Sequence, residues 1–95
     1  MNDKILQWAD ERNLLKEENK LAQFTKLAEE VGELGRAILK DDSELMVDSI
    51  GDIQVVLIIL SEQLGIDYEA SLIFAYDEIK NRKGKTINGS FIKEK

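Results

Sequence analysis

The stretch VDSIGDIQVVLIIL, residues 47–60, decides how this chain folds, because it joins two aspartates to the most apolar run in the sequence. The part from Ile53 to Leu60 is rich in β-branched residues, which also suit a buried strand. A helix is favoured, because the run lies inside a longer capped pattern and no second strong strand is available to pair with it. We therefore predict one helix over Ser43–Leu64.

The preceding segment, Lys20 to Lys40, predicts a second long helix. Its apolar residues recur at helical spacing and centre near Phe24 and Val31, so we expect that stripe to face the core. The short turn from Asp41 to Ser43 has capping side chains and predicts an antiparallel helical hairpin. The stripe consists of Leu21, Phe24, Leu27, Ala28, Val31, Leu34 and Ile38.

Shorter elements are predicted on both sides of this hairpin. A first helix over Asn2–Arg12 is followed by a polar connection, residues 13–19. Beyond Gly65, Asp67 caps a fourth helix that reaches about Arg82. The Asn88-Gly89 pair at residues 88–89 predicts a small C-terminal hairpin, or an arm onto a neighbour. The predicted fold is all-α, a four-helix bundle forming one domain over residues 1–95 and completed by oligomerisation.

Composition excludes several classes of function. The chain has 95 residues and a net charge of −6, which argues against non-specific binding to nucleic acid or to an anionic membrane. It has no cysteine and no histidine, so catalysis would use carboxylates, lysine, tyrosine or metal-bound water. No signal peptide or membrane-spanning run is visible, so we expect a cytoplasmic protein. The apolar run from Ile53 to Leu60 suggests an oligomer interface.

Five carboxylates flank the predicted core: Glu29, Glu30, Glu33, Asp48 and Asp52. Acids beside a buried face are costly without a partner, and no basic residue is close in sequence to the two aspartates. Oxygen ligands of this kind favour Mg²⁺, Mn²⁺ or Ca²⁺ over zinc. The alternative is that the glutamates form an ordinary solvated helix face.

Helical geometry groups these acids. Glu30 and Glu33 are about 60° apart on one flank of their helix, whereas Glu29 points further round. Asp48 and Asp52 are one turn apart on the next helix. In an antiparallel hairpin, four of the carboxylates would converge between the two helices, where metal ions can activate water and neutralise a polyphosphate.

A basic cluster lies near the end of the fourth predicted helix, at Lys80, Arg82, Lys83 and Lys85. Phosphoryl transfer needs cations that position the phosphates, so Lys80, Lys83 and the nearby Tyr76 are candidate substrate contacts. The alternative is that the cations only complement the helix dipole.

Several strings resemble the MazG-like nucleotide pyrophosphohydrolases of the all-α NTP pyrophosphatase superfamily, short phage and bacterial type. They are KLAEEVGELGRAI (26–38), DSIGDIQVVL (48–57), AYDEIKNRKGK (75–85) and NGSFIKEK (88–95). The family pattern is Glu-Glu-x-x-Glu on one helix and Glu-x-x-Asp on the next. The likeness extends from Trp8 to the tail.

The resemblance implies a helical dimer or tetramer that hydrolyses a (deoxy)nucleoside triphosphate to the monophosphate and pyrophosphate with Mg²⁺, or with Mn²⁺ as the alternative. By position, Glu30, Glu33 and Asp52 match the metal-binding acids, and Glu29 matches the leading glutamate, which orients water or completes the site. The glutamate of the second motif falls on Ser49, and Asp48 is the expected substitute.

The remaining substrate contact is Gln23, which lies on the acidic side of its helix within reach of a base. A second hypothesis competes with the enzyme: a non-catalytic helical oligomerisation or regulatory module, with a structural cation or a degenerate nucleotide site. An interaction module would not need Asp48 and Asp52 at the start of its most apolar helix.

Overall fold

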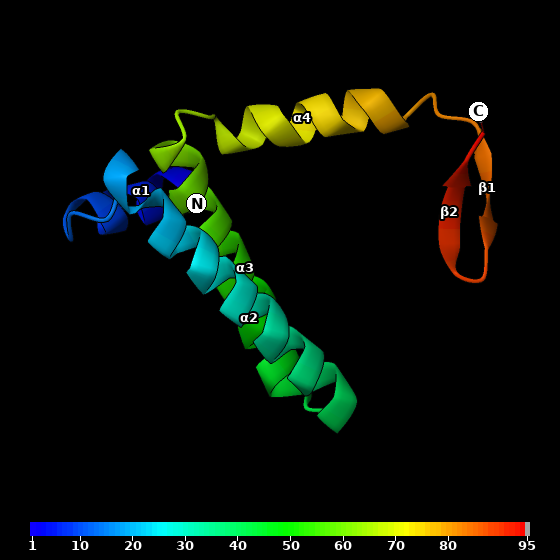
Figure 1. Ribbon diagram of the computed structural model, residues 1–95, viewed down its shortest axis with the longest axis horizontal. Helices are drawn as coiled ribbons and strands as arrows, with labels where there is room; N and C mark the ends of the chain where they lie inside the picture. Colours follow the sequence, from blue (N-terminus) through cyan, green and yellow to red (C-terminus); the bar gives the residue numbers. More distant parts are fainter. Residues whose placement is uncertain (95) are drawn as a thin grey trace.

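The computed structural model describes residues 1–94, and nearly all of its regular structure is helical (Figure 1). The predicted all-α fold is therefore confirmed, together with a small C-terminal hairpin. The elements in chain order are α1 (Asn2–Asp10), the 3₁₀ turn η1 (Glu17–Asn19), α2 (Lys20–Lys40), α3 (Ser43–Gln63), α4 (Tyr68–Ile79), β1 (Gly84–Ile87) and β2 (Ser90–Lys93).

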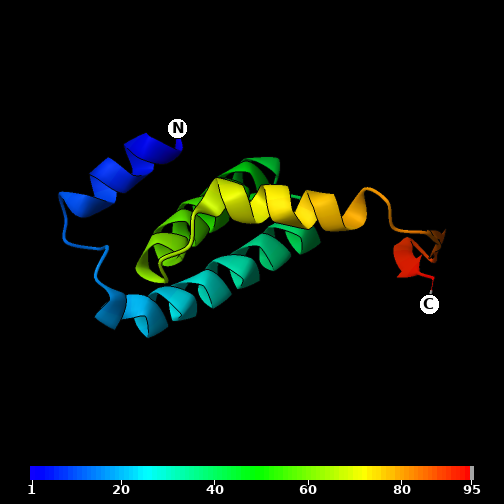
Figure 2. The ribbon, with the colours of Figure 1, turned by 90° about the horizontal axis from the view of Figure 1, so that it is seen from above.

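The long helices α2 and α3 form the predicted antiparallel pair and lie side by side in both views (Figures 1 and 2). The turn between them is set by Asp41, which adopts a left-handed conformation with φ of 54°. Asp42 then caps α3, because its carboxylate accepts a hydrogen bond from the Leu45 N–H at 3.1 Å. Between the helices Ala37, Val56 and Ile59 are buried.

The face of α2 that packs inward is not the one that the apolar periodicity indicated. The less exposed residues of α2 recur along the side that faces α3, and they include two glutamates and a glutamine. The expected core residues Phe24, Val31 and Ile38 are instead between 53% and 59% exposed. The prediction holds for Leu27 and Leu34, which lie on the inward side. It was wrong for the rest of the stripe, because the periodicity finds an apolar face without showing what covers it. The inward side consists of Gln23, Leu27, Glu30, Glu33, Leu34 and Ala37.

The apolar run of α3 is largely covered within the chain. Val56, Ile58 and Ile59 are buried, and the helix is tied to the segment before η1 by the Gln63 side chain, which donates to the Leu14 carbonyl at 2.7 Å. The prediction that this run forms the oligomer surface is therefore wrong for those three residues. None of the described helices is both long and apolar enough to cross a membrane.

Helix α4 leaves the end of α3 and extends away from the α2–α3 pair (Figure 1). Its cap is Asp67, as predicted, with the Ala70 N–H donating to the carboxylate at 2.9 Å. The helix ends at Ile79 rather than Arg82, because the Arg82 N–H bonds three residues back to Ile79 in a tighter turn.

The hairpin at the outer end of α4 has the turn that its sequence predicted. Asn88 and Gly89 both have positive φ, 51° and 79°, as a two-residue hairpin turn requires. At its base Gly84 pairs with Lys93, and any side chain at Gly84 would collide with the Ile92 carbonyl and the Phe91 ring. The glycine is therefore required for the strands to pair.

Candidate active site

The acids of α2 lie along the edge that it turns toward α3. The Glu30 side chain is only 16% exposed and forms an ion pair with Lys26 at 3.8 Å between Nζ and Oε1. Glu33, one turn later, is half-exposed and accepts a hydrogen bond from the Arg36 guanidinium. Glu29 is exposed on the outer side. Glu30 and Glu33 are thus the two acids of α2 nearest the pair's interior.

The two long helices bring particular residues to matching heights. Glu30 and Asp52 lie equally many residues before and after the turn residue Asp41. The same holds for Glu33 and Ser49. Because the helices are antiparallel and rise equally per residue, each of these pairs lies at one level of the helical pair. The Glu-Glu-x-x-Glu string of α2 therefore lies opposite the Ser-x-x-Asp string of α3.

On the α3 side of this region, a buried position is occupied by a serine and a half-buried position by an aspartate. Ser49 is only 2% exposed, and Asp52, three residues later, is half-buried on the same stripe. Asp48 is exposed and lines a shallow hollow near the turn, together with Asp42 and Glu44. Ser49, which faces Glu33, thus offers a hydroxyl group. The neighbouring carboxylate, that of Asp48, lies toward solvent.

The acidic side chains do not converge on a common position for a metal ion. Among residues 1–94, no three acidic side chains lie close enough together to hold one ion. Glu30 and Glu33 are instead neutralised by Lys26 and Arg36. All the donors are oxygen atoms, which suits Mg²⁺ chemically. Binding a cation between the helices would require both glutamates to exchange these basic partners for the metal.

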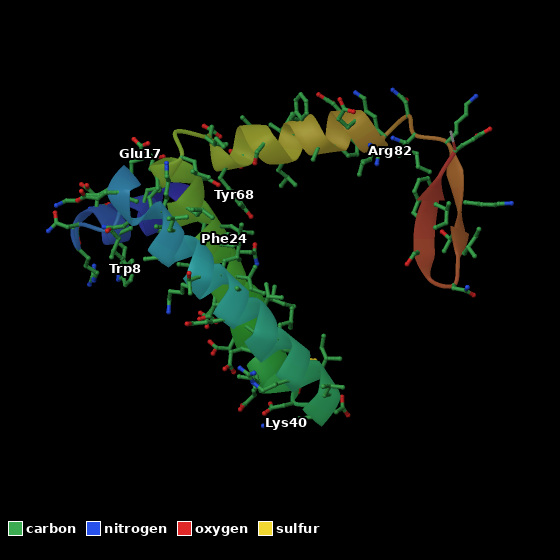
Figure 3. The ribbon with its side chains drawn as sticks, viewed as in Figure 1. Trp8, Glu17, Phe24, Lys40, Tyr68 and Arg82 are labelled. Carbon is green, nitrogen blue, oxygen red and sulfur yellow. The ribbon has the colours of Figure 1, made fainter. Side chains whose placement is uncertain are left out.

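The candidate phosphate contacts lie on a different part of the molecule. Tyr76 is on the outer half of α4, where Lys80 pairs with Asp77 at 3.1 Å, and Lys83 follows the helix. Figure 3 shows the neighbouring Arg82 at the far end of α4, well away from α2. Within the described chain α4 contacts α3 but not α2. The acids and these cations therefore cannot meet the same small ligand in one copy of the chain.

Gln23 differs from those three contacts in its position. It lies on the inward side of α2, two turns before Glu30, and is half-buried. It is therefore the one candidate substrate residue that shares the helical pair with the acids.

A cavity of about 480 Å³ that the sequence did not predict lies between α1, α3 and the start of α4. Ile5, Val55 and Leu72 give it a mainly apolar lining from the three helices. On α3, Gly51 and Val55 line it on either side of Asp52 in the sequence. The signal in the sequence was Gly51, whose missing side chain leaves open space on this face.

Two comparisons with known proteins returned matches. A family model described as the MazG nucleotide pyrophosphohydrolase domain matches residues 15–86, from the segment before η1 into β1. An uncharacterized 18.2 kDa protein from the rep–hol intergenic region of Haemophilus phage HP1 (strain HP1c1) is 46% identical over 63 residues, which cover 66% of this chain and 39% of that protein. The chain thus spans less than half of that relative. No solved structure matches the chain significantly.

Proposed function

The chain belongs to the MazG nucleotide pyrophosphohydrolase family, and from this premise we propose that it hydrolyses a nucleoside triphosphate to the monophosphate and pyrophosphate with Mg²⁺. One observation supports this most directly. Glu30 of α2 and Asp52 of α3 lie at the same level of the helical pair, with Glu33 one turn away. Mn²⁺, which has similar ligand preferences, is the alternative ion.

The metal ligands in this proposal are Glu30, Glu33 and Asp52. Glu29, which is exposed beside them, orients the attacking water. Asp48 lies on the solvent side of α3 and reaches a second ion only through a bridging water. Glu30 and Glu33 exchange Lys26 and Arg36 for the metal, so cation binding releases two basic side chains at the edge of the site.

A bound metal would supply charge neutralisation and an activated water for cleavage of the phosphoanhydride. The protein's own contribution is positioning. Gln23 on the inward side of α2 contacts the base, while Tyr76, Lys80 and Lys83 hold the phosphates. Because these last three residues lie on the extended α4 segment, they reach the acids only from a second copy, and the enzyme is a homo-oligomer, a dimer or tetramer.

The direct test is pyrophosphate release from a panel of ribo- and deoxyribonucleoside triphosphates, with and without Mg²⁺. We expect metal-dependent release by the unaltered protein and none by Glu30→Gln. Glu62→Gln, which changes an exposed acid near the end of the same helical pair, is the matched control and should retain activity. Release that persists in Glu30→Gln would refute the assignment of this acid.

A second candidate function rests on Ser49. If the hydroxyl at this position leaves the site one carboxylate short, the chain binds a nucleotide or a structural cation as a regulatory module without hydrolysing it. Calorimetric binding of a non-hydrolysable triphosphate analogue, combined with no pyrophosphate release by folded protein, is the result that this alternative predicts.

A further inference from the structure

Two neighbouring hollows lie where α1, α3 and the start of α4 meet. The larger is the apolar cavity of about 480 Å³, a volume typical of small-molecule sites. The smaller has a volume of about 110 Å³. Asn2, Ile58 and Tyr68 line both, so the two hollows adjoin at these residues. In Figure 3, Tyr68 lies in the angle between α3 and α4.

The smaller hollow is an acidic pocket. Asp3 of α1, Glu62 of α3 and Asp67, the cap of α4, each contribute a carboxylate to its lining. Within residues 1–94, none of the three forms an ion pair, and neither hollow has a lysine or arginine in its lining. The three acids are also too far apart to share one metal ion. Their charge therefore suits an organic cation better than an inorganic one.

Two side chains at the junction of the hollows add features that an amine can use. The Oδ1 atom of Asn2 is buried without a hydrogen-bond donor, which costs free energy. Rotation about the last torsion of this side chain is soft, so the oxygen can turn to meet an N–H group of a ligand. The half-buried Tyr68 contributes an aromatic ring, whose face attracts cations.

We propose that these hollows bind a small organic amine, with its apolar body in the larger cavity and its ammonium group in the acidic pocket. The sign of the charge sets the class of ligand. Glu69 at the larger cavity is also an acid, so an anionic ligand such as a nucleotide is repelled from both hollows.

This amine site is separate from the candidate active site. The α3 residues that line the larger cavity, Gly51, Gln54, Val55 and Ile58, centre about a third of a turn around the helix from Asp52. An amine bound there leaves the acids between α2 and α3 accessible to a metal and a nucleotide.

The first experiment measures binding of phenethylamine by calorimetry at low ionic strength, because this probe joins an ammonium group to an apolar ring. Phenylethanol, which has a similar shape without the charge, and phenylpropionate, which has the opposite charge, are the matched controls. We expect one phenethylamine per chain, with phenylethanol about tenfold weaker because several ion pairs are lost together, and no binding of phenylpropionate. Equal affinities for the amine and the alcohol, or no binding of phenethylamine by the folded protein, would overturn the proposal.

The second experiment fills the cavity. Gly51 has open space beside it, and leucine favours a helix more than glycine does, so Gly51→Leu should fold. Its leucine occupies the space of the ligand and should weaken phenethylamine binding by more than about tenfold, since a filled interior does not admit a second ring. Gly35→Leu makes the same change in open space on the exposed side of α2 and should bind like the unaltered protein.

A milder variant tests the acidic pocket alone. Glu62→Gln should weaken phenethylamine roughly twofold to fivefold, the scale of one exposed ion pair, and should leave phenylethanol unchanged. Circular dichroism checks that each variant keeps its helices. If Gly51→Leu bound phenethylamine as tightly as Gly35→Leu does, the amine would lie elsewhere and the assignment would be wrong.

None of these measurements uses a nucleotide or a metal. A protein that binds phenethylamine and releases no pyrophosphate would contradict only the proposed function, whereas one that hydrolyses triphosphates and binds no amine would contradict only the amine site.

Discussion

Helices α3 and α4 have the same kind of N-terminal cap but differ in how much of each helix is buried. Each starts with an aspartate whose carboxylate accepts a hydrogen bond from the N–H three residues later, Asp42 from Leu45 and Asp67 from Ala70. Both are strongly apolar, yet α3 buries five residues and α4 buries none among those described. Local signals therefore determine where a helix begins, while its burial depends on which element the connection brings alongside.

The largest effect should come from changing one acid in the helical pair. We expect Asp52→Asn to lower kcat for pyrophosphate release by more than about 100-fold, since it removes a proposed metal ligand. The melting temperature should stay the same or rise, because one of several neighbouring negative charges is removed. Steady-state kinetics and a thermal melt check both parts.

An exposed acid of α4 provides the matched control for Asp52. Glu78→Gln removes an exposed carboxylate from α4 and should change kcat by less than about threefold, the scale of a surface change. An Asp52→Asn protein that unfolds would show that the aspartate has a structural role instead.

Much of this arrangement could be read from the sequence. The bounds of α2, the caps at Asp42 and Asp67, and the Asn88-Gly89 turn all rest on short-range chemistry, and all are confirmed. The level shared by Glu30 and Asp52 follows from the turn length alone. These features depend on neighbours in the chain, so the sequence contains the information directly.

Two features could not be read in this way. Phe24 and Val31 form as good an apolar stripe as Leu27 and Leu34, and only the docking of α3 decides which one is covered. Lys80 and Lys83 were expected near the acids because phosphoryl transfer needs cations that hold the phosphates, but the short segment after α3 directs α4 outward. Both differences arise from tertiary contacts, which leave no periodic signal in one chain.

The second prediction compares matched isoleucines in the two regions. Ile59→Ala in α3 should lower the free energy of unfolding by about 2–5 kcal/mol, because it leaves a cavity at a buried site. Ile73→Ala in α4 should have little effect on the monomer and should act only through association. Urea unfolding at several protein concentrations separates the two cases. If Ile73→Ala lowered the free energy of unfolding by the same amount at every protein concentration, α4 would pack within its own chain.

The third prediction concerns the metal. Mg²⁺ at 10 to 100 times its dissociation constant should stabilise the folded protein by roughly 1 to 3 kcal/mol, because only the folded chain brings the acids together. The melting temperature should rise by several degrees, and Glu30→Gln should lack the rise. Sodium chloride at equal ionic strength is the control for screening. An equal rise with the salt alone would remove the thermal evidence for a specific site.

The smallest effects should come from the two helix caps, and they test the comparison most directly. Removing either carboxylate leaves a helix N–H without its partner, which costs about 1 kcal/mol. In Asp42→Ala the loss should appear in global unfolding at every protein concentration, since α3 is part of the core. In Asp67→Ala it should appear as a roughly 30-fold weaker dimer, because both chains of a dimer lose the cap and about 2 kcal/mol corresponds to that factor in an association constant. Urea unfolding measures the first change and sedimentation equilibrium the second. Asp67→Ala could instead lower global stability as much as Asp42→Ala and leave the dimer unchanged. In that case α4 would belong to the same folding unit as α3, and the distinction between the α2–α3 pair and α4 would be wrong.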